Sequence, residues 1–350
     1  MKVNRESNTY YERTKAMQSS GLIRFEKWVG VLLVVALHSH AVCLGAPFEP
    51  SLSEGERPFK FASVSEGQEV LSTTDEFVMQ MSAFDRQVRL HSEADQGVTK
   101  LMNFSANQVR QWTSEEKEIL TESISRLEPK LQELGMTWSE PIKIIKTTGQ
   151  EESDAAYTRG MAIIFPQSKV GTLDRLPTRL LAHELFHVIS RSKPELRDRL
   201  FKLIGFHRVP MIELPKHLDE MRITNPDAPK IEHIIQLHLD ADVKVFATPF
   251  LFSKEAYTPT KKSLFGYLQF QLMKVVKTTN GNWIPAGEEL SELFISPDHP
   301  DYWRQIGGNT RYVIHPEEIM ADNFSLLITG EKPKDPLLIE AVKRELLHQQ

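Results

Sequence analysis

Cysteine is nearly absent from this chain of 350 residues, because Cys43 is the only one. The rest of the protein can therefore contain neither a disulfide nor a thiolate ligand to a metal. This count excludes cysteine proteases, zinc fingers and deformylase-like metal sites with a cysteine ligand.

A strong charge bias is also missing. The formal net charge is -5, and the lysines and arginines are scattered among aspartates and glutamates instead of forming a basic stripe. Nucleic acid is therefore not an expected partner. We find no low-complexity tract and no internal repeat, so the body of the chain is expected to fold as a globular protein, with its oligomeric state left open.

No apolar run approaches the roughly 20 residues that a membrane-spanning helix needs. Residues 28–37 are apolar, follow two basic residues and lead to a plausible cleavage point before Ala46. This pattern predicts that residues 1–45 form a secretory signal peptide, with an uncleaved membrane anchor as the alternative. Both readings place the body outside the cytoplasm, either secreted or in the periplasm or cell envelope.

The domain organisation follows from composition and periodicity. Residues 46–80 are rich in serine and glutamate and contain three prolines, so we expect an extended lead-in with little order. Residues 81–350 are expected to form the catalytic domain. A helix should begin at Thr113 and end at Gly135, and strands are expected at residues 141–146 and 156–165.

The second half of the chain changes character twice. A helix is expected from about Pro177 to Ile189, and another covers residues 195–203. Residues 206–310 then carry a proline-rich connection, alternating strand patterns and the hairpin signal Asn280-Gly281, which predict a largely β insertion. Two final helices are expected at residues 315–327 and 336–347.

Residues 183–187 read His-Glu-Leu-Phe-His. Two histidines four residues apart on a helix lie about 400° around its axis, so His183 and His187 project from one face and reach a single metal. Glu184 lies beside the first ligand, where it can take a proton from a zinc-bound water whose pKa the metal has lowered. The alternative is a structural helix that happens to carry two histidines.

A catalytic zinc site needs a third protein ligand and leaves its fourth position to water. Glu318 and Asp322 lie four residues apart on the predicted helix that follows Pro316. Glu318 is the preferred ligand, because Asp322 can then accept a hydrogen bond from the remote nitrogen of a ligand histidine. Choosing Glu317 would put an alanine in that second place. The rival ligands are His207, Glu213, Asp219 and Glu220.

Hydrolysis of a peptide also requires a donor for the developing oxyanion. Tyr312 and His315 directly precede the predicted helix of Glu318 and are the catalytic candidates for this role. The alternatives are a packing role for Tyr312 and a position beside the helix cap for His315.

These motifs resemble the zincin metallopeptidases, specifically the gluzincin branch, in which His-Glu-x-x-His is completed by a glutamate on a later helix. The resemblance covers residues 183–187 and 318–322 and implies an α+β fold, a zincin-like lobe whose antiparallel edge strand receives an extended peptide or protein substrate. Residues 157–165 stand where that edge strand is expected. Ser190 and Lys193 occupy positions where metzincins need glycine and histidine, so that branch is excluded.

By this resemblance His183, His187 and Glu318 bind Zn2+, Glu184 is the general base, and Asp322 supports a ligand. The function expected is that of a secreted zinc metallopeptidase. Two alternatives stay open: an extracellular or envelope binding protein that keeps a zincin-like shell without turnover, and a zinc hydrolase of a non-peptide bond.

Overall fold

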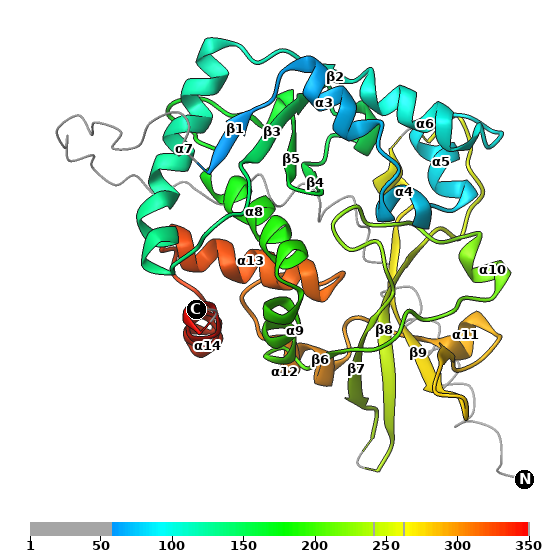
Figure 1. Ribbon diagram of the computed structural model, residues 1–350. Coiled ribbons are helices and arrows are strands. Elements are labelled where there is room, and N and C mark those ends of the chain that lie inside the picture. Colours follow the sequence, from blue (N-terminus) through cyan, green and yellow to red (C-terminus); the bar gives the residue numbers. More distant parts are fainter. Residues whose placement is uncertain (1–57, 241, 262, 349–350) are drawn as a thin grey trace, which may run out of the picture. The chain divides into compact units, whose positions relative to one another are not determined.

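The computed structural model describes residues 58–348, except residues 241 and 262 (Figure 1). The signal peptide or anchor predicted for residues 1–45 lies outside the described residues, as does the first part of the predicted lead-in. Among the residues that are described, no helix is both long enough and apolar enough to cross a membrane.

The first sheet is mixed and ends in an antiparallel edge strand. Its order is β1-β3-β5-β4, and β2 pairs with β3 outside this path. Strands β1, β3 and β5 run parallel, whereas β4 is antiparallel to β5. The strands are β1 (Phe59–Phe61), β2 (Val109–Arg110), β3 (Ile142–Thr147), β4 (Tyr157–Arg159) and β5 (Ala162–Pro166).

The single strand predicted for residues 156–165 is wrong in one respect, because the segment forms the hairpin of β4 and β5. Gly160 lies at the turn with a φ of 54°, a backbone conformation that glycine adopts without the penalty of a side chain. The turn folds β4 back along β5, and β4 becomes the edge strand of the sheet.

The lead-in predicted to extend to residue 80 is also wrong from residue 58 onward, where β1 and two helices form. These helices are α3 (Val64–Leu71) and α4 (Glu76–Gln80). Ser63 and Asp75 cap them by accepting backbone N–H bonds, and Leu71 and Phe77 are buried. The three prolines that suggested an extended chain all lie at or before residue 58.

Helix α7 follows the cap signals of the sequence. The capping box of Thr113 and Glu116 opens α7, and Gly135 follows its end with a φ of 63°, as predicted. The helices in this part are α5 (Ala83–Arg89), α6 (Gly97–Ala106) and α7 (Ser114–Glu133), and a short 3-10 helix covers Gln150–Glu152.

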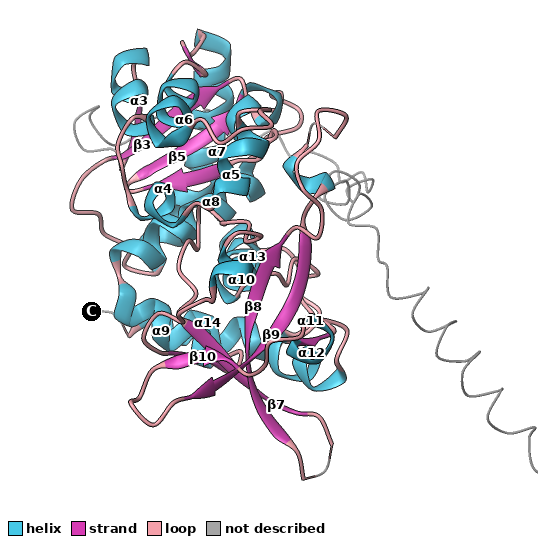
Figure 2. Cartoon of the chain, turned by 90° about the vertical axis from the view of Figure 1, so that its right-hand side faces the viewer, coloured by secondary structure: helices cyan, strands magenta, loops and turns pink. Residues whose placement is uncertain are grey.

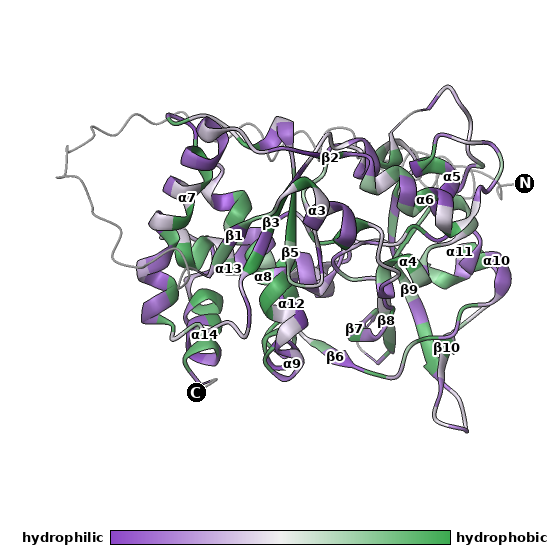
Figure 3. Ribbon diagram, turned by 45° about the horizontal axis from the view of Figure 1, so that its top comes forward, coloured by the Kyte–Doolittle hydropathy of each residue, from purple (hydrophilic) through white to green (hydrophobic). Residues whose placement is uncertain are grey.

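Two helices, α8 and α13, lie side by side at the centre of the described unit (Figure 1). Phe186 of α8 packs on Phe324 of α13 with ring centroids 5.7 Å apart, and both side chains are fully buried. Hydrophobic colouring extends over β3, β5 and α8, while α7 carries a polar face (Figure 3). The helices concerned are α8 (Thr178–Ser192), α9 (Pro194–Lys202), α13 (Pro316–Thr329) and α14 (Pro336–Leu347).

The predicted β insertion is confirmed as a second sheet of order β10-β9-β8-β7-β6 with β11 beside β9, antiparallel throughout (Figure 2). Its strands are β6 (Phe206–Arg208), β7 (His233–His238), β8 (Lys244–Phe252), β9 (Gln269–Lys277), β10 (Trp283–Pro285) and β11 (Phe294–Ile295). The short helices are α10 (Lys216–Asp219), α11 (Leu290–Leu293) and α12 (Pro300–Ile306). The chain thus has the α+β fold class that the sequence predicted.

Candidate metal centre

Helices α8 and α13 bring three possible metal ligands together. The Nε2 atom of His183 lies 3.1 Å from Oε2 of Glu318, and the Nε2 atom of His187 lies 3.6 Å from the same oxygen. The ligand atoms of all three residues lie within 4.8 Å of one another, and the three residues are buried. The two histidines thus reach the glutamate nominated from the sequence, across 131 residues from His187 to Glu318 (318 − 187).

The far nitrogens of the two histidines are each held by a carboxylate. Nδ1 of His183 lies 3.0 Å from Oδ1 of Asp322, and Nδ1 of His187 lies 3.0 Å from Oε1 of Glu317. A proton on each Nδ1 satisfies these contacts, and each Nε2 is directed at Glu318. Both imidazoles are therefore held in the orientation that a metal ligand needs.

Glu317 is a partner that the sequence does not predict, because its position beside Glu318 offers it only as a substitute for that ligand. Consecutive helical residues point about 100° apart, so Glu318 faces the Nε2 atoms of both histidines while Glu317 reaches Nδ1 of His187. Hydroxyl groups hold the outer carboxylates in turn: Ser190 donates to Glu317, and Thr310 donates to Asp322.

Asn225 lies in the connection between α10 and β7 and contacts Glu318. Its Nδ2 donates to Oε1 of Glu318 at 2.6 Å, which leaves Oε2 facing the two histidines. No spacing pattern predicts this contact, because 93 residues separate the two side chains in the chain.

The surrounding carboxylates give the site a negative electrostatic potential. Burial opposes a charge on His183, but hydrogen bonds to Asp322 and Glu318 raise its pKa well above the usual range. Burial also opposes a charge on His187, while the negative charges of Asp227 and Glu318 raise its pKa to about 9. For Glu318 burial acts against ionisation, yet the histidines lower its pKa to about 2. Such a field attracts a cation.

These residues fit a zinc ion. Two imidazole nitrogens and one carboxylate oxygen are the donor set of many catalytic zinc sites. Ligands about 2.0–2.1 Å from a tetrahedral zinc lie roughly 3.3–3.4 Å from one another. The separations of 3.1 and 3.6 Å from the Glu318 oxygen bracket that value.

Glu184 is buried beside the two histidines. Its Oε2 atom has no hydrogen-bond partner among the described residues. Burial, and then the negative charge of Asp227, raise the pKa of Glu184 to about 8. A carboxyl group with a pKa in this range is suited to taking up and releasing a proton near neutral pH.

The two predicted oxyanion donors differ in their surroundings. The ring of Tyr312 lies 6.1 Å from that of His183, and burial, followed by the charge of Glu318, raises the pKa of Tyr312 well above its usual range. His315 is the N-cap of α13, where its Nδ1 accepts the N–H of Glu317 at 3.1 Å. Burial lowers the pKa of His315 well below its usual range. The catalytic roles of both residues stay predictions.

The rival ligands are exposed and belong to neither group of possible metal ligands in the described part of the chain. They lie on β6 and in or near α10, and they are His207, Glu213, Asp219 and Glu220.

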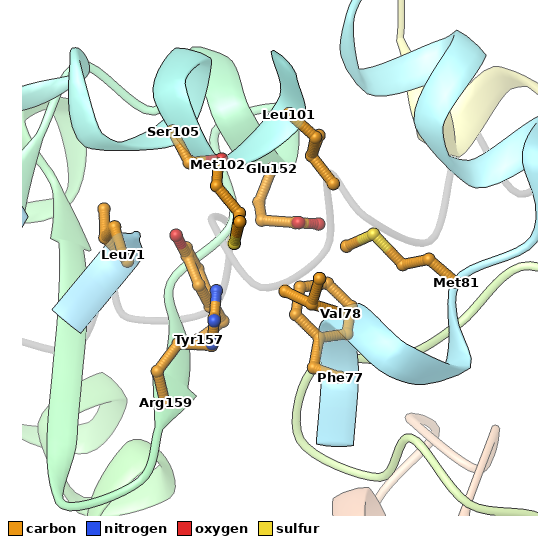
Figure 4. Close-up of a pocket in the computed structure, with 10 residues that line it drawn as sticks. All are labelled: Leu71, Phe77, Val78, Met81, Leu101, Met102, Ser105, Glu152, Tyr157 and Arg159. Atoms are coloured by element: carbon orange, nitrogen blue, oxygen red, sulfur yellow. The ribbon is translucent and has the colours of Figure 1, made fainter. Parts of the chain in front are cut away.

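A separate pocket lies behind β4, where Tyr157 and Arg159 face residues of α4 and α6 (Figure 4). It has room for about one water molecule. Arg159 is bound there to Asp75 and to the carbonyl of Thr73. The contacts of Arg159 fix the edge strand, and the pocket is too small to take a substrate.

Residues 147–195 match the family model of the eCIS core domain, a zincin-like, metalloprotease-related family of contractile injection systems. The matched segment runs from the end of β3 through β4, β5 and α8 and therefore includes both histidines. No curated protein and no solved structure matches the chain.

Proposed function

We propose that this protein is a zinc metallopeptidase exported from the cytoplasm, with His183, His187 and Glu318 as the ligands. One observation carries the proposal: both Nε2 atoms turn to a single oxygen of Glu318 while both Nδ1 atoms are held by carboxylates. Two structural histidines on a buried helix would not require this reciprocal arrangement. The match of residues 147–195 to a zincin-like family supports the same reading.

The residues around the ligands would each have a separate role in hydrolysis. Zinc, when bound, would lower the pKa of water and polarise the scissile carbonyl. Glu184 would accept the proton of the attacking water and deliver it to the leaving nitrogen, since its Oε2 has no other partner in the described region. Tyr312 stays protonated because of its raised pKa and would donate a hydrogen bond to the oxyanion.

The edge strand supports a peptide as the substrate. Strand β4 pairs with β5 on one side only, and β4 is the last strand in the order of its sheet. An extended peptide could add to such an edge through main-chain hydrogen bonds. Its position beside α8 would bring the scissile bond to Glu184. The apolar segment of residues 28–37 supports export, to the cell envelope or beyond.

The proposal is tested on purified protein loaded with zinc, by measuring metal content and cleavage of a peptide library in parallel. Glu184→Gln should keep one zinc ion per chain and lose cleavage by at least about 100-fold, because only the proton transfer is removed. Glu340→Gln, the same exchange on the exposed face of α14, is the matched control and should behave as wild type. Cleavage by Glu184→Gln at the wild-type rate would refute this mechanism.

One observation favours the alternative of a binding protein without turnover. A side chain from the connection between α10 and β7 already occupies the edge strand, since Asp227 contacts Thr158 of β4. Stoichiometric zinc without cleavage of any peptide, even after removal of that contact, would support this alternative.

A further inference from the structure

Asp227, in the connection between α10 and β7, lies between the edge strand and the residues proposed for catalysis. Its Oδ1 accepts the backbone N–H of Thr158 at 2.8 Å and the hydroxyl of the same residue at 2.6 Å. Both bonds engage the same oxygen and leave Oδ2 outside them. Asp227, Glu184 and His187 each have a ligand atom within 4.8 Å of the other two. The carboxylate therefore contacts β4 and also borders the place where water would be activated.

Asn225 fixes Asp227 relative to a ligand of the metal centre. Its side-chain oxygen accepts the N–H of Asp227 at 3.0 Å, and its Nδ2 donates to Glu318 at 2.6 Å. Pro226 and Pro229 restrict the backbone around Asp227. The carboxylate is thus held in place before a substrate binds, which lowers the entropic cost of recognising a ligand.

The N–H that Asp227 occupies points to the open edge of β4. Thr158 is the middle residue of this short strand and lies opposite Ile163 of β5, yet its N–H donates to Asp227. Alternate residues of an antiparallel pair direct their polar backbone groups away from the partner strand. A substrate chain that pairs with this edge therefore cannot continue past Asp227, and one of its two ends must lie there.

The charge around Asp227 selects which end of a chain that is. The carboxyl groups of Asp227, Glu184 and Glu318 converge on the site. The buried Oε2 of Glu184 has no hydrogen-bond partner in the described part of the chain. Arg191 of α8 donates to the hydroxyl of Thr158 at 2.9 Å and is thereby bound to the strand. A positively charged α-ammonium group is attracted to such a place, whereas a C-terminal carboxylate is repelled.

Backbone dimensions select the bond that would be cut. The amine nitrogen and the carbonyl carbon of one residue are two bonds, or about 2.5 Å, apart, and the next carbonyl along an extended chain is roughly 6 Å from the same amine. The ligand atoms of Asp227, Glu184 and His187 lie within 4.8 Å of one another. An amine bound to Asp227 thus places the first carbonyl of the chain, and not the second, beside Glu184.

We propose that the protein is an aminopeptidase in which Asp227 binds the α-ammonium group of the substrate and so restricts cleavage to the first peptide bond. This inference rests on the proposed function. Water adds its oxygen to the first carbonyl carbon, the bond from that carbon to nitrogen breaks, and Glu184 carries the proton of the water to the leaving nitrogen. The products are a free amino acid and a peptide shorter by one residue. Asp227 stays ionised throughout.

The first test uses the full chain loaded with zinc and two peptides of the same sequence, one with a free N-terminus and one with an acetylated N-terminus. Acetylation removes the positive charge and leaves the first peptide bond in place. The free peptide should be cleaved with a kcat/KM about 10- to 100-fold higher, the range expected of a hydrogen bond to a charged group. Mass spectrometry should identify the first residue as the initial product.

Asp227→Asn is the variant that isolates the charge, because asparagine keeps an acceptor for the N–H of Thr158. It should lower kcat/KM for the free peptide by about 10- to 100-fold, chiefly through KM, and leave the acetylated peptide unchanged. Asp298→Asn, the same exchange at an exposed position, is the control and should match wild type.

A second measurement reports binding without turnover. Leucine hydroxamate and its N-acetyl derivative both offer the same chelating group to zinc and differ only at the amine. Calorimetric titration of the zinc-loaded wild type should show about 10- to 100-fold tighter binding of the free-amine compound. Zinc-loaded Asp227→Asn should bind the two compounds equally.

Equal affinity of the two hydroxamates in wild type, or the same ratio of affinities in wild type and Asp227→Asn, would overturn this inference and leave the three-ligand site intact. Cleavage of the acetylated peptide as fast as the free one would overturn it as well. Absence of cleavage of every peptide would refute the proposed function, and the ratio of hydroxamate affinities would show separately whether Asp227 binds an amine. Zinc-loaded protein that binds neither hydroxamate would refute both proposals.

Discussion

The two sides of the candidate site are built differently. On the helix side, α8 and α13 bury the ligands and the carboxylates behind them, with 1% of His187 and 2% of Glu318 exposed. On the opposite side, Asn225 and Asp227 are only half-buried and approach from a connection between secondary-structure elements. The first side is continuous with the apolar core, and the second is joined to the site by hydrogen bonds.

Apolar packing therefore holds the metal centre together, whereas hydrogen bonds hold the segment that covers it. Apolar packing such as that of Phe186 on Phe324 is lost only when the helices part, so the ligand side should persist. A hydrogen bond contributes only about 0.5–1.5 kcal/mol net, because water can replace the partner. We therefore expect that the segment of Asn225 and Asp227 can be displaced without unfolding α8 and α13.

The largest expected effect is the loss of the metal from His187→Ala. The change removes a ligand, so zinc affinity should fall by more than the roughly 10- to 100-fold that an outer partner contributes. Competition with a chromophoric chelator measures the affinity. His207→Ala, at an exposed position on β6, should retain the wild-type value. Unchanged affinity in His187→Ala would remove α8 from the metal site.

Phe186→Ala should give the largest loss of folding stability, since the side chain is fully buried between α8 and α13. The cavity and the lost transfer energy predict a decrease of about 3–5 kcal/mol in the free energy of unfolding. Leu337→Ala is the control, because Leu337 is 81% exposed and should change the stability by less than about 0.5 kcal/mol. Chemical denaturation compares the two, and similar losses would argue against the buried helix pair.

On the side of the edge strand, stability should depend on pH through Glu151. Burial raises the pKa of this carboxyl from 4.5 to about 7, and its side chain faces the hydroxyl of Tyr157 on β4 at 3.5 Å. The folded state therefore binds a proton that the unfolded state releases above about pH 4.5. Stability is highest below that pH and decreases as the pH rises through 7, by about 3 kcal/mol in total.

Glu151→Gln should flatten this part of the pH profile, because glutamine does not titrate. Denaturant midpoints measured from pH 5 to pH 8 for both proteins provide the comparison. If the slopes coincide, the carboxyl group is not protonated in the folded protein near pH 6.

The smallest predicted effects belong to the carboxylates behind the histidines. Asp322→Asn and Glu317→Gln should each weaken zinc binding by about 10- to 100-fold, because they hold the tautomer of a ligand without touching the metal. Glu340→Gln, with its side chain exposed on α14, should bind as wild type does. An effect of Asp322→Asn alone would mean that Glu317 does not support His187.

Much of the helix side could be predicted from the sequence, because its signals are local. The spacing of His183 and His187 and the spacing of Glu318 and Asp322 both follow from the helical repeat. What the repeat cannot give is how one helix crosses another. For that reason the sequence presents Glu317 only as an alternative to Glu318, although in the structure Glu318 faces both histidines and Glu317 holds Nδ1 of His187.

The approach of Asn225 and Asp227 to the site could not be predicted, because their contacts join residues far apart in the chain. Asp227 lies 69 residues from Thr158 in sequence, and Asn225 lies 93 residues from Glu318. The proline-rich connection was recognised as a break between elements, but composition does not tell where such a segment lies in space. The hairpin of β4 and β5 is not predicted for a local reason, since Gly160 alone, within a segment of strand-forming residues, decides between one strand and a turn.

The most direct test of the central claim is a crystal structure of the zinc-loaded protein with anomalous data collected at the zinc edge. The account predicts a single strong peak about 2 Å from Nε2 of His183, Nε2 of His187 and a carboxylate oxygen of Glu318. A peak bound by other residues, or no peak between α8 and α13 in zinc-loaded crystals, would contradict it.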